Sequence, residues 1–312
     1  MSIFSIYFSP TGGVKKVMTT LEEEFKAALT QDSSKDTAQK EDTGSKLITI
    51  DLLKPDTDYA SYHFTAKDVC LVGVPSFGGR VPDVVIERLK KMSANKAKAV
   101  AVVVYGNRHY DDTLLELKDV LEGIGFTVIA GITANAKHSI FKQYATLRPD
   151  AEDKTELKTF AGEILCKLYS LRNAAGIGVA DSANADGSAD GSADDSADGS
   201  ADDSADGSSN TCAGDSITVP GNRPYREYPG HPLKPITNDY CVLCRACVKK
   251  CPTEAIPQDA PDTTIAEKCI TCMRCIAACP FDARSLDKAA VAAAAEKMAP
   301  AFEGRKPNEL FI

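Results

Sequence analysis

The chain has 312 residues, of which 43% are hydrophobic and 26% charged, a composition typical of a globular protein of about two domains. It contains no run of 18 apolar residues, so the sequence excludes a transmembrane helix. The formal net charge of -8 arises in residues 181–208, which hold nine aspartates and no Lys or Arg. We therefore expect neither a basic nucleic-acid-binding surface nor an acidic mimic of nucleic acid.

Residues 1–172 alternate between strand and helix patterns. Short apolar runs bounded by turn residues predict five strands, at residues 3–8, 46–52, 68–75, 99–105 and 126–132. Apolar residues at helical spacing follow the first, third, fourth and fifth runs, whereas residues 53–67 are too weakly periodic to predict a helix. Parallel strands joined by crossover helices predict a doubly wound α/β domain, with helices on both faces of the sheet.

Two polar stretches interrupt these patterns. Residues 31–45 indicate an exposed insertion before the second strand. Residues 181–208 repeat the tetrapeptide Ala-Asp-(Gly or Asp)-Ser, which offers little to bury and whose like charges repel, so we expect a disordered linker over residues 173–214. A calcium-binding repeat is the alternative, but the ligand spacing and apolar anchors of such sites are missing. Cys212 in this linker has no partner at ligand spacing.

Eight of the 11 cysteines lie within residues 241–279. The spacing C-x2-C-x2-C-x3-C-P occurs twice, first with Cys241, Cys244, Cys247 and Cys251, and then with Cys269, Cys272, Cys275 and Cys279. The N-terminal residues do not have the pattern of a secretory signal, so we expect metal ligation in a cytoplasmic protein instead of disulfides.

The spacing favours two [4Fe-4S] clusters. Three cysteines within seven residues converge on one cluster, and the fourth, just before proline, points toward the other cluster. We therefore predict a first cluster held by Cys241, Cys244, Cys247 and Cys279, and a second held by Cys269, Cys272, Cys275 and Cys251. Structural zinc is the alternative, but zinc sites use two Cys-x2-Cys pairs, which two identical runs of four do not fit.

On these motifs, residues 238–284 resemble a bacterial-type two-[4Fe-4S] ferredoxin. The resemblance implies one-electron transfer at low potential, with no substrate chemistry in the module itself. We assign residues 215–312 to this second domain, which includes a proline-rich arm before the cysteines and an alanine-rich helix after them.

Three loops of the first domain lie at the carboxyl edge of the expected sheet. The loop after the first strand carries hydroxyl groups, glycines and the N–H groups of a helix N-terminus, which suit a phosphate: Ser9, Pro10, Thr11, Gly12, Gly13 and Val14. The loops after the third and fourth strands carry aromatic rings beside glycine and amide groups, which suit a flat heterocycle: Pro75, Ser76, Phe77, Gly78 and Gly79, then Tyr105, Gly106, Asn107, Arg108 and Tyr110.

Together these loops resemble those of the flavodoxin family, over residues 1–172. The resemblance implies the strand order 2-1-3-4-5 and an FMN cofactor, with its phosphate at residues 9–14 and its isoalloxazine between residues 75–80 and 105–110. Val14 departs from the family, which usually has threonine there, so one phosphate hydrogen bond would be lost. A flavodoxin-like fold without cofactor is the alternative. For His109 and His138, a surface role and proton transfer to the flavin both remain open.

The whole chain resembles the flavodoxin–ferredoxin fusion proteins of anaerobic bacteria. The stretches that fit are Phe8–Gly12, Val104–Arg108, Pro220–Tyr225 and Arg305–Ile312. The resemblance predicts an electron-transfer protein that links two [4Fe-4S] clusters and FMN, with redox proteins as donor and acceptor. An FMN-dependent reductase of a small acceptor and a regulatory module with a vacant flavin site are the alternatives. No G-x-G-x-x-G motif follows a strand, so the sequence shows no NAD(P) fingerprint.

Overall fold

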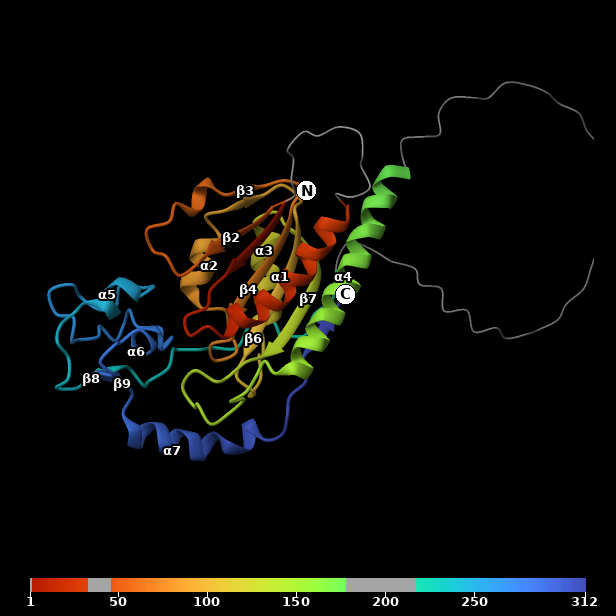
Figure 1. The fold of residues 1–312 in the computed structure, drawn as a ribbon. Helices are drawn as coiled ribbons and strands as arrows, with labels where there is room; N and C mark the ends of the chain where they lie inside the picture. Colours follow the sequence, from red (N-terminus) through yellow and green to blue (C-terminus); the bar gives the residue numbers. More distant parts are fainter. Residues whose placement is uncertain (1, 33–45, 178–216) are drawn as a thin grey trace, which may run out of the picture.

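The computed structural model describes residues 2–32, 46–177 and 217–312 (Figure 1). Most of the expected insertion at residues 31–45, and the acidic repeat with Cys212, lie outside the described residues. No helix in the described part of the chain is both long enough and apolar enough to cross a membrane.

A six-stranded sheet forms the centre of the first domain (Figure 1). Its order is β10-β7-β6-β4-β1-β2, and its strands are β1 (Ile3–Tyr7), β2 (Leu47–Asp51), β4 (Val69–Pro75), β6 (Lys98–Tyr105), β7 (Thr127–Asn135) and β10 (Glu309–Phe311). The first five strands are parallel, which confirms the predicted order 2-1-3-4-5. The central strands β4 and β6 are rich in valine and buried almost throughout, as a sheet covered on both faces requires.

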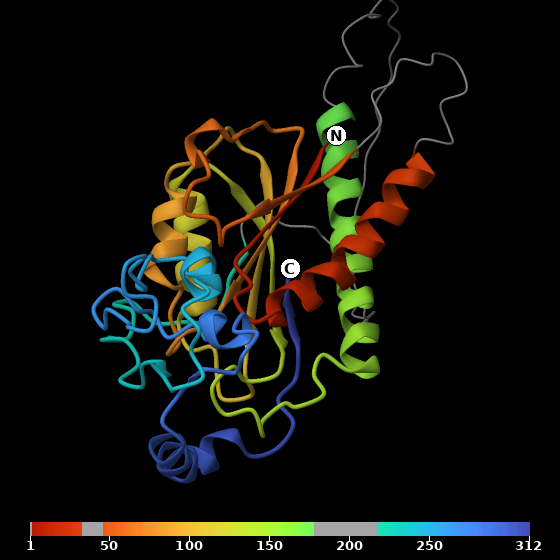
Figure 2. The ribbon, with the colours of Figure 1, turned by 60° about the vertical axis from the view of Figure 1, so that its left-hand side comes forward.

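Helices cover both faces of this sheet (Figure 2). One face packs against α1 (Gly13–Asp32) and α4 (Ala151–Ile177), and the other against α2 (Asp83–Leu89) and α3 (Thr113–Gly123). Each layer has its own apolar core, with Leu21 and Ile164 on one side and Val85 and Leu117 on the other.

Residues 53–67, for which the sequence predicts no helix, contain only short elements. They form a 3-10 turn, η1 (Tyr59–Ser61), and a two-residue strand, β3 (His63–Phe64), which pairs with β5 (Ser93–Ala94). The three-layer arrangement therefore carries one crossover without an α-helix, between β2 and β4.

Residues 234–286, which we call the cysteine module, contain little regular structure. They form β8 (Ile236–Thr237), α5 (Ala246–Lys250), α6 (Arg274–Ala277) and β9 (Arg284–Ser285), and are followed by α7 (Lys288–Met298) and η2 (Ala299–Phe302). The buried apolar cluster of the module consists of Cys247, Ile256 and Cys275 with a few half-buried neighbours. So small a core cannot stabilise the module alone.

Residues 217–233, which we call the arm, run along the first domain before they reach the cysteines. Ile217 and Val219 belong to the apolar core beside α3. The Asp112 carboxylate accepts hydrogen bonds from the backbone N–H groups of Asn222 at 2.8 Å and Arg226 at 2.6 Å. The arm is thus held by its backbone as well as by apolar burial.

Residues 299–311, which we call the strap, return from α7 to the sheet. The Asn107 side chain donates hydrogen bonds to the carbonyl oxygens of Phe302 at 2.8 Å and Gly304 at 2.9 Å. The strap then ends in β10, which pairs antiparallel with β7. The sequence did not predict this strand, because three residues carry too little periodicity to mark one.

The cysteine module also contacts the first domain directly. The buried Arg88 of α2 donates to Leu52 O and to Pro252 O, both at 2.5 Å, and Pro252 follows a cysteine of the first run. Ile270 of the module packs against the core beside α2 and α3. The residues assigned from sequence to the second domain, 215–312, therefore include an arm and a strap that lie on the first domain.

We predict that the buried polar contacts of the strap stabilise the fold more than its exposed ion pairs. Asn308 is 7% exposed; its side chain donates to Asp153 Oδ1 at 2.9 Å and accepts from the Asn135 N–H at 2.9 Å. Asn308→Ala leaves buried groups unpaired and should lower the free energy of unfolding by about 1–3 kcal/mol. Chemical denaturation measures the difference.

The matched control is Arg305→Ala in the same strap. The Arg305 guanidinium pairs with Asp150, Glu152 and the buried Asp153, but its side chain is 41% exposed, and Asp153 keeps its pair with the buried Arg148, so the loss should stay below about 1 kcal/mol. Equal losses for the two variants would contradict the prediction.

Candidate functional site

The turn between β1 and α1 presents unpaired backbone donors. Ser9 Oγ accepts the N–H of Lys15 at 2.8 Å, so the Ser9 hydroxyl caps the helix and keeps its own proton free to donate. Among the described residues, none accepts a hydrogen bond from the N–H groups of Gly13 and Val14. These donors lie at the N-terminus of a 20-residue helix, where an anion is stabilised.

The position that departs from the flavodoxin pattern, Val14, is part of the core. Its side chain is 3% exposed and packs against β4, where a Cβ added to Gly73 would lie 3.1 Å from Val14 Cγ1. Because the side chain packs against the sheet, a hydroxyl at this position would replace an apolar contact.

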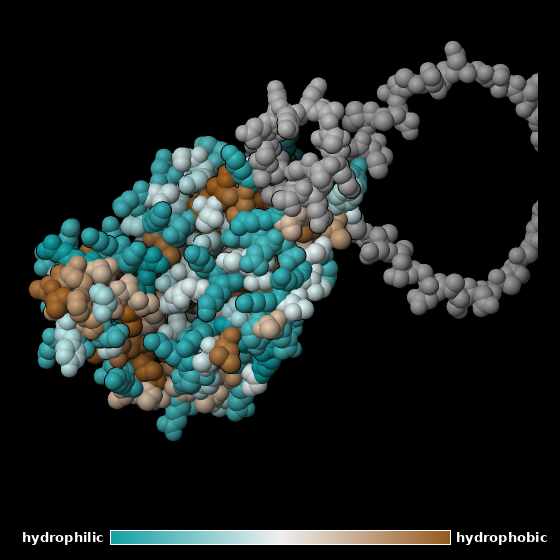
Figure 3. Space-filling model, in the orientation of Figure 1, coloured by the Kyte–Doolittle hydropathy of each residue, from teal (hydrophilic) through white to brown (hydrophobic). Residues whose placement is uncertain are grey.

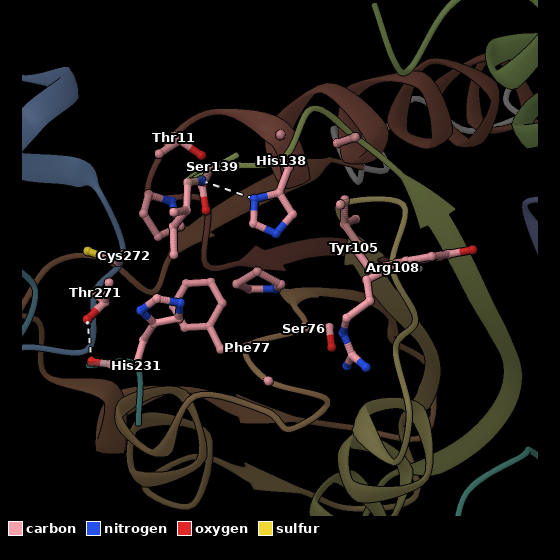
Figure 4. Close-up of a pocket in the computed structure, with 18 of the residues that line it drawn as sticks. Thr11, Ser76, Phe77, Tyr105, Arg108, His138, Ser139, His231, Thr271 and Cys272 are labelled. Carbon is pink, nitrogen blue, oxygen red and sulfur yellow. Dashed lines mark hydrogen bonds between the residues drawn. The ribbon is translucent and has the colours of Figure 1, made fainter. Parts of the chain in front are cut away.

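The turn forms one end of a cavity of about 310 Å³ (Figure 4). Twelve of the residues that the sequence predicted for cofactor binding line it: Ser9, Pro10, Thr11, Gly13, Val14, Pro75, Ser76, Phe77, Gly78, Tyr105, Gly106 and Arg108. The carboxyl ends of β1, β4 and β6 bring these residues together, because neighbouring parallel strands end at one edge of the sheet.

Four of the predicted residues do not line the cavity: Gly12, Gly79, Asn107 and Tyr110. The Asn107 side chain holds the strap, and the Tyr110 hydroxyl donates to Glu309 Oε2 of β10 at 2.8 Å. Tyr105 lines the cavity, but its hydroxyl donates to Pro307 O of the strap. In this loop, the two tyrosine hydroxyls and the amide of Asn107 therefore bind the strap.

Part of the cavity wall comes from residues that the sequence did not indicate. The arm contributes Tyr228 and His231, and the strap contributes Phe302. A Cβ added to Gly78 would lie 2.2 Å from the Tyr228 ring, so this ring can pack here only over glycine. These residues lie more than 100 positions from the loops they face, and no local pattern marks them.

The cavity also borders the cysteine module. Ile270, Thr271 and Cys272 line it together with the β1–α1 turn, and Thr271 Oγ1 donates to His231 O at 3.5 Å (Figure 4). One member of the second cysteine run thus shares a cavity with the β1–α1 turn.

His138 lines the same cavity, and its environment fixes its protonation state. Its Nδ1 accepts the N–H groups of Ile140 at 3.1 Å and Phe141 at 3.0 Å, so Nε2 carries the hydrogen of the neutral ring. Burial, together with smaller contributions from the neighbouring His231 and Arg108, lowers the pKa of His138 to about 4. The ring lies against Gly106, where a Cβ would approach His138 Cδ2 to 2.5 Å.

The eight cysteines surround two further cavities in the module. One is lined by Cys241, Cys244, Cys247 and Cys279, which we call the first cysteine set, and the other by Cys251, Cys269, Cys272 and Cys275, the second cysteine set. Each cavity combines three thiols of one run with the fourth thiol of the other run, the grouping that the spacing predicts.

The backbones of the two runs repeat one conformation. Positive φ angles occur at Leu243 and Arg245 in the first run, and at Thr271 and Met273, 28 positions later, in the second. The fourth thiols also match, because Cys251 Sγ accepts the N–H of Ala255 at 3.2 Å and Cys279 Sγ that of Ala283 at 3.3 Å. Non-glycine residues in this region of φ concentrate at functional sites.

The donors fit iron–sulfur clusters better than single metal ions. Within residues 2–32, 46–177 and 217–312, no group of three or more His, Cys, Asp or Glu side chains is arranged to hold a single metal ion. Burial raises the pKa of the Cys272 thiol to about 12 and that of Cys275 to about 11, so these ligands need a metal to become thiolates. Each cavity is lined by four thiols, which is the number of ligands that a cubane cluster takes.

Comparison with known proteins identifies the second domain. Residues 234–280 match the family of 4Fe-4S dicluster domains. The chain therefore joins a flavodoxin-like fold to a ferredoxin-like 4Fe-4S domain, and its general function is electron transfer. No match was found among curated proteins.

Solved structures similar to the first domain include two flavodoxins. The flavodoxin of Streptococcus pneumoniae TIGR4 is 14% identical, with a TM-score of 0.38, over 54% of this chain and 99% of its own. That of Megasphaera elsdenii is 21% identical, with a TM-score of 0.32, over 52% and 98%. Rubredoxin oxygen:oxidoreductase from Desulfovibrio gigas is 16% identical, with a TM-score of 0.35, over 54% and 36%. The fold assignment depends on the strand order and not on these scores.

We predict that His138 stays neutral throughout pH 5.5–8, because burial disfavours the charged imidazolium and lowers the pKa of the ring to about 4. Imidazole ¹H–¹⁵N spectra should show a single tautomer with its hydrogen on Nε2 over this range. A protonation midpoint between pH 6 and 7, or a hydrogen on Nδ1, would contradict the prediction.

Proposed function

We propose that the protein carries two [4Fe-4S] clusters and one FMN, and that electrons pass between a partner protein, the first cluster, the second cluster and the flavin. The observation that carries the proposal is the shared cavity, which is lined both by Cys272 of the second cysteine set and by the β1–α1 turn of the flavodoxin-like domain. A flavin in this cavity would lie beside the second cluster.

The cavity suits FMN in chemistry and in size. The unpaired N–H groups of Gly13 and Val14 and the hydroxyls of Ser9 and Thr11 would hold the phosphate. Phe77 and Tyr228 would enclose the ring system, and about 310 Å³ is at the lower end of cofactor sites. Bound FMN would accept one or two electrons, whereas each cluster accepts one.

The exposure of the thiols supports the order of the two clusters. In the first cysteine set, Cys244 is exposed, and Val242 and Leu243 beside it are 59% and 54% exposed. The second set has two buried thiols, Cys272 and Cys275, and no exposed one, whereas the first set has one buried thiol, Cys247. Hydrophobic side chains gather on the surface at the α5 end of the module (Figure 3), where a redox partner could approach the first cluster.

A second candidate function is an FMN-dependent reductase of a small anionic acceptor. A neighbouring cavity of about 770 Å³ shares Thr11, His138 and Ser139 with the first cavity. Lys16, Lys137, Lys142 and Lys288 line it. Steady turnover of a small anionic acceptor without a protein partner would favour this function over a carrier.

We predict that the clusters are ligated across the two runs. Anaerobically purified protein should contain about eight iron, eight sulfide and one FMN per chain. Cys241→Ala and Cys279→Ala should damage the same centre in electron paramagnetic resonance spectra of the reduced protein, and Cys251→Ala the other centre.

Cys166→Ala is the matched control, because Cys166 is an exposed residue of α4, far in sequence from both runs, and this variant should keep both centres. If Cys241 and Cys251 affect one centre and Cys279 the other, the crossed arrangement is wrong. Stoichiometric zinc without acid-labile sulfide would contradict the assignment of iron–sulfur clusters altogether.

We predict that Thr11 binds the FMN phosphate. A hydroxyl hydrogen bond to a charged phosphate contributes about 1.5–3 kcal/mol, so Thr11→Val should weaken FMN binding about 10- to 150-fold. Titration of the full chain, freed of flavin, measures the FMN dissociation constants of the wild-type protein and the variant.

Riboflavin, which has no phosphate, is the control ligand and should bind equally to both proteins. Val14→Thr should not tighten FMN, because the Val14 side chain packs against β4. If Thr11→Val leaves FMN affinity unchanged, or weakens riboflavin equally, the turn is not the phosphate site.

A further inference from the structure

Arg284, the first residue of β9, is a buried cation without an acidic partner. It is 3% exposed, and among the described residues no carboxylate forms an ion pair with it. Its partners are neutral: one guanidinium nitrogen donates to Thr264 Oγ1 at 2.8 Å, and the other to Pro261 O at 2.6 Å and Thr263 O at 2.8 Å. A charge so buried normally has a counter-charge, because removing it from water is costly.

One polar atom of Arg284 has no partner at all. Its Nε is buried and forms no hydrogen bond in the described part of the chain. The same side chain lines the cavity of the first cysteine set. A buried, unsatisfied N–H beside a cavity surrounded by thiols is the arrangement expected where the acceptor belongs to a bound group.

Arg284 also lies near the second cysteine set. It is the first residue of β9, and β9 packs beside α6, which carries Cys275. One buried cation is therefore close to both sets.

We propose that Arg284 is the internal counter-charge of the two clusters, that its Nε–H donates to a sulfur of the first cluster, and that it thereby raises the reduction potential of that cluster most. The inference rests on the proposed two-cluster function. The 2+ core of a [4Fe-4S] cluster and its four thiolates sum to about two negative charges, and one-electron reduction adds a third. A fixed neighbouring cation stabilises the reduced form more than the oxidised form, because the attraction grows with the negative charge.

A purely structural role predicts a different result. Arg284 ties β9 to residues 261–264, so its loss must weaken the module whatever its electrical role. Lysine at position 284 keeps the positive charge but loses the forked hydrogen bonds to residues 261–264, so Arg284→Lys separates an electrical role from a structural one.

Arg245 provides a matched control for charge. It lies between Cys244 and Cys247 and lines the same cavity as Arg284, but it is exposed. Water and salt screen an exposed charge, whereas a buried charge is screened much less. Arg245→Gln and Arg284→Gln each remove one positive charge beside the first cluster. The two variants differ in whether that charge is exposed or buried.

The experiment is a redox titration of the full chain, in which dithionite supplies one electron to each cluster and electron paramagnetic resonance follows the reduced centres. Arg284→Gln should lower the equilibrium constant for reduction of the first cluster about tenfold or more, which is about 59 mV or more for one electron. The second cluster should shift in the same direction by less. Arg284→Lys should retain most of the wild-type potential.

Arg245→Gln should shift the first cluster by less than Arg284→Gln, and its shift should vanish at high salt. Equal shifts in these two variants, or unchanged potentials in Arg284→Gln with both clusters present, would overturn the inference. Absence of two [4Fe-4S] signals from the wild-type protein would instead overturn the proposed function on which it rests.

A measurement on the wild-type chain covers the case in which Arg284→Gln binds no clusters. Arginine labelled with ¹⁵N only in the guanidinium group should give a nitrogen coupling to the reduced first cluster in pulsed electron paramagnetic resonance. Arg245→Gln should keep this coupling, and Arg284→Lys should lose it. Absence of the coupling from the wild-type protein would overturn the proposed hydrogen bond between Arg284 Nε and the first cluster.

Discussion

The arrangement of the molecule depends on how two irregular segments satisfy their backbone hydrogen bonds. The arm and the strap cross the carboxyl edge of the sheet mostly without secondary structure, and buried backbone groups require partners. Side chains of the first domain supply them: Asp112 binds the arm, and Asn107 binds the strap. The β1–α1 turn and Cys272 line one cavity because these contacts position the cysteine module at that edge.

This attachment changes the role expected of the acidic linker. A disordered linker would by itself keep the two domains close, because it raises the effective concentration of one domain near the other. In the structure, the arm, the strap and the Arg88 contact with Pro252 O all join the module to the first domain. In the function proposed above, electrons would therefore cross a packed interface and would not wait for a diffusive encounter.

Local patterns in the sequence predicted a large part of the fold and part of the site. The parallel strands with crossover helices follow from apolar runs, and the grouping of the thiols follows from the spacing of two short motifs. The strand order came instead from the resemblance to flavodoxins. Tyr228, His231 and Phe302 could not be predicted, because they reach the cavity only through the paths of the arm and strap. Asn107 and Tyr110 were predicted as cofactor residues, since a loop sequence does not reveal that its side chains bind another segment of the chain.

The position of the strap in the sequence sets an order of assembly. Residues 302–309 bind Asn107, Tyr105 and Tyr110 in the loop after β6, yet the ribosome makes them after all eight clustered cysteines. Domains fold largely in the order of their synthesis, so the first domain waits with an open sheet edge at β7 until β10 arrives. The loop that borders the cavity is thus fixed only after the cysteine module has emerged, which favours insertion of iron and sulfide before the cavity is complete.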